Sequence, residues 1–258
     1  MSRDIDVSHA GHVATIEIRR PPLNYFDLEL IRSIADALDA IDANPAVRAV
    51  VLAAQGKAFC AGADFGSAAA KTGEERASQG AAHLYVEAVR IFRNKKPIVA
   101  AVHGAAIGGG LGLAMSADFR VTCAEARFSA NFTKLGFHPG FGLTVTLPAL
   151  IGSTKAALMF YTSRRVTGKE AYEMGLADIL VSQDEVRSAA LKLAEEIAEC
   201  SPLGLLATRA TMREGLAERV RQATDHELAE QSRLRQTDDF KEGVEATAER
   251  RAPVFKGR

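Results

Sequence analysis

The sequence predicts an α/β fold in which strands alternate with helices, followed by a C-terminal part made of helices alone. Two apolar runs, at 47–54 and 97–102, are typical of strands that are buried on both faces of a sheet. Stretches with helical spacing separate the strand patterns, which implies βαβ units with parallel pairing. After Gly142 helical patterns dominate the rest of the chain.

The N-terminal half begins with a predicted hairpin, because strand patterns at 5–7 and 14–18 flank a turn that contains Gly11. Asp27 is the predicted N-cap of a helix that runs to the residues before Pro45. The segment 67–80 is small, polar and charged, and we interpret it as mobile and close to a site. A helix at 83–92 follows it.

The second half contains short strands and then helices. Thr167 and Glu170 have the spacing of a capping box at the start of a helix. Residues 179–181 form the last predicted strand. The remaining helices are expected at 184–199, 202–213, 216–232 and 238–250.

Composition excludes several classes of function. The 258 residues include 32 Lys and Arg and 32 Asp and Glu, so the net charge is +0 and no basic field favours nucleic acid or an anionic membrane. No apolar run reaches membrane-spanning length. The three cysteines, Cys60, Cys123 and Cys200, have no zinc-site or disulfide spacing. The N-terminus does not resemble a signal peptide, and we expect a cytoplasmic protein without a metal.

A glycine-rich turn between the strand at 97–102 and a helix is the candidate site. Gly108, Gly109 and Gly110 open that helix, where unpaired N–H groups carry the positive end of the helix dipole. Such N–H groups stabilise a carbonyl oxygen or a developing oxyanion. Tight packing of the helix on the sheet is the alternative explanation for these glycines. The spacing does not fit a dinucleotide fingerprint, and Ala58 after Gly56-Lys57 does not fit a Walker A loop.

The order of several short motifs along the chain resembles the crotonase superfamily of enoyl-CoA hydratases and isomerases. The resemblance covers nearly the whole chain, and it is specific because all the motifs occur in order. They are 59–64, 108–110, 118–120, 134–140, 167–168, Ala171, 175–177 and 240–243.

The resemblance implies a ClpP/crotonase spiral of ββα units over residues 1–200 and a C-terminal helical trimerisation region over 201–258. It implies a homotrimer or a dimer of trimers. The expected partner is an acyl-CoA thioester, with CoA as part of the substrate, no other cofactor, and neither nucleic acid nor membrane.

By the same resemblance, the backbone N–H groups of Ala63 and Gly109 form an oxyanion hole. Further residues are expected to bind the substrate or CoA, although Asp64 has a cap as its alternative role and Arg250 a solvated charge. They are Leu23, Ala61, Asp64, Phe65, Gly108, Gly110, Phe132, Phe137 and Arg250.

The chain departs from this family where the chemistry matters. Enoyl-CoA hydratases carry two glutamates, and here Gly112 and Phe132 stand at those positions. Other members place an aspartate further on, where this chain has Gly140. Because each general acid or base typically contributes a factor of 10²–10⁴, ordinary hydratase activity is doubtful.

His138 is the first candidate for the missing proton-transfer group, because an imidazole titrates near neutral pH. Packing within its loop is the alternative. His83 and Tyr85 follow the segment 67–80 and are able to reach the site, although a structural role is favoured for both. The sequence thus predicts an acyl-CoA lyase or isomerase of fatty acid metabolism. The alternatives are a decarboxylase, a thioester hydrolase that uses His138, and a non-catalytic acyl-CoA-binding paralogue.

Overall fold

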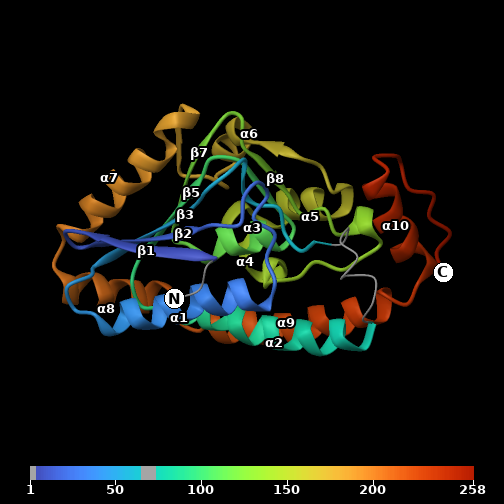
Figure 1. Cartoon of the computed structure of the whole chain (residues 1–258), viewed down its shortest axis with the longest axis horizontal. Helices are drawn as coiled ribbons and strands as arrows, with labels where there is room; N and C mark the ends of the chain where they lie inside the picture. The colour runs from blue at the N-terminus through green and yellow to red at the C-terminus, as the bar shows by residue number, and fades with distance from the viewer. Residues whose placement is uncertain (1–3, 65–73) are drawn as a thin grey trace.

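The computed structural model describes residues 4–64 and 74–258, without the side chains of 74–83. Its strands form two sheets with helices packed around them (Figure 1). The larger sheet has the order β1-β2-β3-β5-β7-β10, and the smaller has the order β4-β6-β8-β9. The strands are β1 (Ile5–Ala10), β2 (Val13–Ile18), β3 (Ala49–Ala54), β4 (Ala58–Cys60), β5 (Ile98–Val102), β6 (Ala105–Ile107), β7 (Phe119–Cys123), β8 (Arg127–Ser129), β9 (Val166–Thr167) and β10 (Ile179–Val181).

The larger sheet confirms the predicted hairpin and the predicted parallel pairing. β1 and β2 are antiparallel, with Ile5 opposite Ile18, and every later pair in this sheet is parallel. All residues of β3 and β5 are buried. Such continuous apolar strands suit the centre of a sheet that is covered on both sides.

Ten α-helices are described, and most begin where the sequence predicts. Asp27 caps α1 by accepting a hydrogen bond from the Leu30 N–H at 3.0 Å. The capping box of Thr167 and Glu170 is present at α6. The helices are α1 (Leu28–Ala43), α2 (Glu74–Arg93), α3 (Gly109–Ser116), α4 (Leu143–Ile151), α5 (Ser153–Thr162), α6 (Gly168–Glu173), α7 (Val186–Ala198), α8 (Pro202–Met212), α9 (Leu216–Leu234) and α10 (Asp238–Ala248).

One helix boundary differs from the prediction. Helix α2 begins at Glu74, whereas the sequence indicated a start at 83 and a mobile segment over 67–80. Residues 74–80 are therefore helical, and 67–73 lie outside the described residues. The run of small and polar residues hides this helix because it lacks the regular apolar stripe that marks the others.

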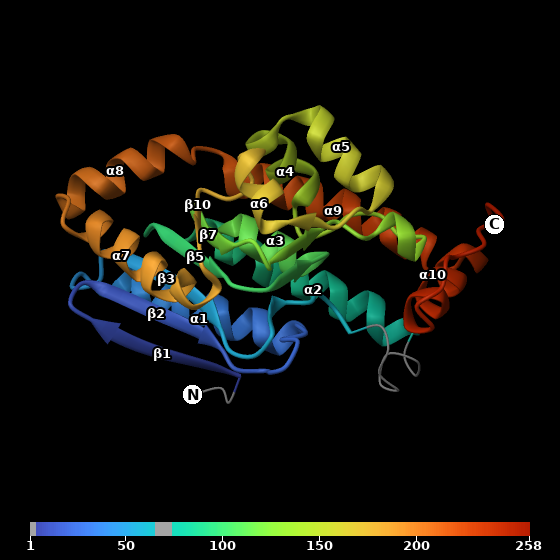
Figure 2. The same ribbon diagram turned by 90° about the horizontal axis from the view of Figure 1, so that it is seen from above.

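The C-terminal helices pack onto the core and bring distant residues to one place. Figure 1 shows α9 lying along α2, and the two helices are in contact. Helix α10 packs against the 3₁₀ turn η2 (Thr133–Leu135) at the end of the molecule opposite α7 and α8 (Figure 2). In the described part of the chain, no helix is both long enough and apolar enough to cross a bilayer.

A cluster of buried ion pairs connects α8 to the larger sheet. The Asp118 carboxylate accepts hydrogen bonds from Arg209 at 3.0 Å, from Arg213 at 3.0 Å and from the Ile98 N–H at 2.8 Å. Arg209 also donates to the carbonyl oxygen of Asn94. One carboxylate thus pairs with two guanidinium groups that the fold removes from water.

Candidate active site

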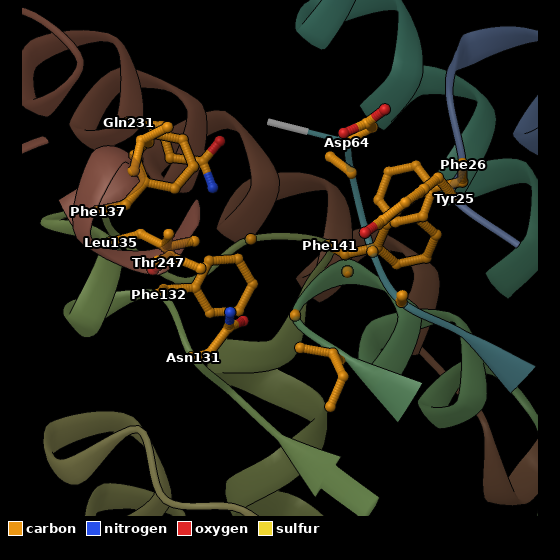
Figure 3. Close-up of a pocket in the computed structure, with 18 of the residues that line it drawn as sticks. Tyr25, Phe26, Asp64, Asn131, Phe132, Leu135, Phe137, Phe141, Gln231 and Thr247 are labelled. Carbon is orange, nitrogen blue, oxygen red and sulfur yellow. The ribbon is translucent and has the colours of Figure 1, made fainter. Parts of the chain in front are cut away.

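A cavity of about 320 Å³ lies beside the N-terminus of α3, between the glycine turn and the C-terminal helices (Figure 3). Its wall is mostly apolar. In Figure 3, Leu135, Phe137, Gln231 and Thr247 lie on one side, and Tyr25, Phe26, Asp64 and Phe141 lie on the other. The apolar lining residues include Phe26, Leu84, Ile107, Phe132, Leu135, Phe137, Phe141 and Val244.

The glycine turn presents a free backbone donor to this cavity. Gly108 precedes α3 with a φ of 56°, a conformation that favours glycine. The first hydrogen bond of the helix runs from the Gly112 N–H to the Gly108 carbonyl oxygen at 3.1 Å. The N–H of Gly109, which lines the cavity, comes before that bond and has no acceptor within the helix.

Ala63 brings a second donor next to Gly109. Phe26 forms an isolated parallel bridge with Ala63 and donates its N–H to the Gly62 carbonyl oxygen at 3.0 Å. In such a bridge the neighbours of Ala63 make the hydrogen bonds, and Ala63 itself lines the cavity. A Cβ atom on Gly62 would stand 2.7 Å from the Ile107 oxygen and 3.7 Å from the Gly109 nitrogen, so this segment packs directly against the start of α3.

The absence of side chains at 109 and 110 has a packing reason. A Cβ atom on Gly109 would overlap the ring of Phe26, and one on Gly110 would overlap the carbonyl oxygen of Cys60. Gly108 and Gly109 line the cavity, whereas Gly110 faces β4. Close helix packing therefore explains Gly109 and Gly110, and the role of the turn as a donor to a ligand stays a prediction.

The positions that lack a carboxylate are filled by other groups. A Cβ atom on Gly112 would stand 2.6 Å from Cβ of Phe141, whose ring borders the cavity. Phe132 lines the cavity and stacks on Phe137 at a centroid distance of 6.5 Å. A Cβ atom on Gly140 would overlap the Tyr85 hydroxyl and stand 2.5 Å from the Gln231 amide nitrogen.

Tyr85 supplies a hydroxyl group to the cavity wall. It donates a hydrogen bond to Oε1 of Gln231 at 2.9 Å, and Nε2 of Gln231 donates to the His138 carbonyl oxygen at 3.0 Å. Burial, together with the negative charge of Glu227, raises the pKa of Tyr85. The phenol therefore keeps its proton at neutral pH.

Glu227 lies behind this wall, and its carboxylate binds backbone N–H groups. Its carboxylate accepts hydrogen bonds from the N–H groups of Gly142 at 2.9 Å and of Thr144 at 3.2 Å, at the start of α4. Burial raises its pKa. Among the described residues that line the cavity, Asp64 is the only one with a carboxylate, and Asp64 is exposed.

His138 lies outside the residues that line the cavity. Its Nδ1 atom is 2.8 Å from the carbonyl oxygen of Pro139, and its ring meets the His226 ring edge-on at 5.8 Å. These contacts match the packing role that the sequence left open as the alternative to catalysis.

The remaining predicted residues divide into two groups. Ala61, Asp64, Phe132 and Phe137 line the cavity. Leu23 and Arg250 are exposed and stand outside it, with the Leu23 carbonyl oxygen accepting from the Ala61 N–H at 2.9 Å. Phe65 lies outside the described residues.

Two lining residues, Gln231 and Arg235, were missed by the sequence analysis. They occupy successive turns of α9 and its C-cap, more than 140 residues after Tyr85 in the chain. Two polar side chains four residues apart on the inward face of a helix were the available signal. Only the packing of α9 on α2 shows which wall they join.

The two sheets, the helical C-terminal part and the glycine turn beside the cavity define a member of the crotonase superfamily. The family model described as enoyl-CoA hydratase/isomerase matches residues 8–258. The chain therefore belongs to the enoyl-CoA hydratase/isomerase family.

Relatives span the whole chain. It is 32% identical over 263 residues to a carnitinyl-CoA dehydratase of Salmonella typhi, with 100% of both chains covered. The crystal structure of an enoyl-CoA hydratase/isomerase from Pseudoalteromonas atlantica T6c superposes with a TM-score of 0.84 at 28% identity, covering 98% of this chain and 100% of that one. An enoyl-CoA hydratase from Mycobacterium avium subsp. paratuberculosis K-10 gives 0.84 at 27% identity, covering 98% of each chain.

Proposed function

We propose that this protein is an enzyme that acts on an acyl-CoA thioester and stabilises its enolate with the N–H groups of Ala63 and Gly109. The observation that carries the proposal is the pair of adjacent backbone donors at the wall of an apolar cavity. The names of the relatives, which act on enoyl-CoA and carnitinyl-CoA thioesters, support the substrate class.

The two donors suit a reaction in which charge moves onto the thioester oxygen. Donors fixed before the reaction stabilise that charge without reorganisation, and each typically contributes roughly 3–4 kcal/mol to lowering the barrier. The apolar rings around the cavity exclude water and strengthen the interaction. Since the donors belong to the backbone, no side-chain substitution removes them directly.

We further propose that hydration of a double bond is not the principal reaction. Water addition needs a base for the water and an acid for the carbon, and the aromatic rings of Phe132 and Phe141 stand where those carboxylates would reach. Cleavage of a bond between Cα and a neighbouring carbon, as in decarboxylation, needs fewer groups. The electron pair of the Cα–carboxylate bond moves toward the thioester oxygen as CO₂ leaves. Cα of the enolate then takes a proton from the Tyr85 hydroxyl, water returns a proton to the phenolate, and the resulting hydroxide combines with CO₂ as bicarbonate.

A product screen by mass spectrometry tests both parts. Purified protein is incubated with malonyl-, β-keto-, enoyl- and aromatic acyl-CoA thioesters, beside the variants Tyr85→Phe and His138→Ala. We expect the wild type to consume a malonyl thioester, Tyr85→Phe to be slower by about 10²–10⁴-fold, and His138→Ala to resemble the wild type.

Other results would redirect the proposal. If His138→Ala is inactive and Tyr85→Phe is not, proton transfer belongs to the imidazole. If no thioester changes although acyl-CoA binds, the protein is a non-catalytic acyl-CoA-binding paralogue. The missing carboxylates favour this second candidate, and the binding measurement separates it from a substrate that the panel lacks.

Assembly as a trimer or a dimer of trimers is also proposed from the family. Helix α8 exposes large apolar side chains, with Leu203 at 80% and Met212 at 83% of their full accessible surface. Burial of such residues between subunits is a common reason for their presence on a surface. Light scattering after size-exclusion chromatography would give the mass, and a monomer of 27.6 kDa would exclude the proposal.

A further inference from the structure

Arg235 is a cationic group at the cavity wall that has no anionic partner in the described part of the chain. It caps the C-terminus of α9 and lines the cavity, with its guanidinium carbon 5.1 Å from the centre of the Phe137 ring. Its buried Nε atom has no hydrogen-bond partner among the described residues. A planar cation held over an aromatic face keeps its edge available for a ligand.

The two arginines that are buried in the described part of the chain both have a carboxylate partner. The buried Arg120 pairs with Asp178 at 2.9 Å, and Arg209 pairs with Asp118 at 3.0 Å. Arg233, which lies two residues before Arg235 and is largely exposed, pairs with Glu230 at 2.6 Å. Burial lowers the pKa of Arg235. Removing a charge from water without a partner is costly, so such a group marks a place for an anion.

We propose that the acyl group of the substrate carries a carboxylate remote from the thioester, and that this carboxylate pairs with Arg235. The substrate class is then an acyl thioester with a carboxylate at the far end of its acyl chain, separate from any carboxylate that leaves from Cα. This inference rests on the proposed function, because the acyl group must enter the cavity with its carbonyl oxygen at Ala63 and Gly109.

The arrangement of the cavity favours an acyl carboxylate over a CoA phosphate. Arg235 lies over Phe137, which is on the opposite side of the cavity from Asp64 in Figure 3. Asp64 adjoins Ala63, one of the proposed oxyanion donors. An acyl chain held at these donors therefore extends toward Arg235 past Phe132 and Leu135, which are apolar and buried.

The carboxylate at Arg235 is a recognition group and not a leaving group. An ion pair stabilises the carboxylate in the ground state, whereas loss of CO₂ discharges it. Bidentate pairing with the flat guanidinium would select a carboxylate over a neutral amide of the same shape. The amide is therefore the matched comparison ligand.

Binding measurements with paired ligands test the inference. Calorimetry compares glutaryl- and adipyl-CoA with their terminal amides, and then the same acyl groups on pantetheine, which lacks the nucleotide phosphates. The proteins are the wild type, Arg235→Met, Arg235→Lys and, as a matched control from the same helix, Arg233→Met. We expect the wild type to prefer at least one carboxylate over its amide by about tenfold or more, on both carriers.

In the variants, Arg235→Met should lose that preference and still bind the amides, Arg235→Lys should keep part of it, and Arg233→Met should keep all of it. A wild type that binds acids and amides equally would overturn the inference and leave the proposed function intact. If Arg235→Met weakens binding of the CoA acid and the CoA amide equally and does not affect the pantetheine ligands, Arg235 binds a CoA phosphate. That result would also overturn the inference. Failure of every thioester to bind would instead refute the proposed function.

Discussion

The Tyr85 hydroxyl donates a hydrogen bond of 2.9 Å to the side-chain carbonyl oxygen of Gln231, which joins α2 to α9 at the cavity wall. The pair occupies the space into which a side chain on Gly140 would project. Where relatives are expected to place a carboxylate, this chain therefore places a neutral donor. A phenol retains its proton at neutral pH, whereas a carboxyl group normally does not.

The Tyr85 phenol should make the stability of the protein depend on alkaline pH. Its pKa is raised in the folded state by burial and by Glu227, whereas an unfolded tyrosine titrates near pH 10. The folded chain holds the proton more tightly, so this contribution to stability is complete below about pH 10 and is lost as the pH rises through the folded pKa.

Urea unfolding of the wild type and Tyr85→Phe at pH 7.5 and pH 10.5 measures this effect. We expect the stability of the wild type relative to the variant to fall by about 1 kcal/mol between these two pH values. A difference that stays constant would show that the phenol titrates alike in both states.

A methyl group at Gly140 should conflict with the Tyr85 hydroxyl. Because the added Cβ atom would overlap that oxygen, Gly140→Ala should lower the free energy of unfolding by about 1–3 kcal/mol. In the Tyr85→Phe background the overlapping atom is gone, and the same substitution should cost less. Denaturant titration of the wild type, Gly140→Ala, Tyr85→Phe and the double variant completes a double-mutant cycle. The cycle gives the coupling free energy between the two positions.

Gly204→Ala is the control for this cycle, because the nearest atoms to its new Cβ would be 3.7 Å away on Ser201. It should be neutral or slightly stabilising within α8. Equal costs of Gly140→Ala in both backgrounds would mean that the loop moves away from Tyr85.

Local patterns predicted much of the fold. The strand Ile179–Val181 begins and ends where the sequence indicated, and the Thr167 capping box is present, because both depend on residues close in the chain. The glycine turn was identified for the same reason. The start of α2 at Glu74 was not predicted, since its first turns lack an apolar stripe.

The polar residues of the cavity wall could not be predicted from patterns of residues that are close in the chain. Tyr85 was given a structural role, and Gln231 and Arg235 were not considered, because their proximity depends on α9 packing against α2. Gly112 shows a second limit. The sequence reveals the missing carboxylate, whereas only the structure shows that Phe141 fills the space beside it.

Asp118 should be a strong determinant of stability. Asp118→Asn removes the charge that neutralises Arg209 and Arg213, and breaking one side of a buried ion pair typically costs about 3–5 kcal/mol. Asp225→Asn, which removes an exposed partner of Arg221, should cost less than about 1 kcal/mol. Chemical denaturation compares the two variants. Equal losses would mean that the buried cluster contributes no more than a surface pair.

The three cysteines should differ sharply in reactivity. Cys200 is exposed, whereas Cys60 and Cys123 are buried, and burial raises the pKa of Cys60 to about 12. Since only the thiolate reacts, Cys60 should be inert at pH 8 while the protein is folded. Titration with a chromogenic disulfide should find one rapid thiol in the native protein and three in denaturant.

Cys200→Ser should abolish the rapid reaction in the native protein. The carbonyl oxygen of Cys60 lies against Gly110, so access to its thiol requires α3 to separate from β4. A rapid reaction that persists both in Cys200→Ser and in the double variant Cys123→Ser/Cys200→Ser would come from Cys60 and would reveal opening at the base of the glycine turn. Slowing of that reaction by an acyl-CoA thioester would then connect the opening to the proposed oxyanion site, because a ligand that binds only the closed form suppresses opening by mass action.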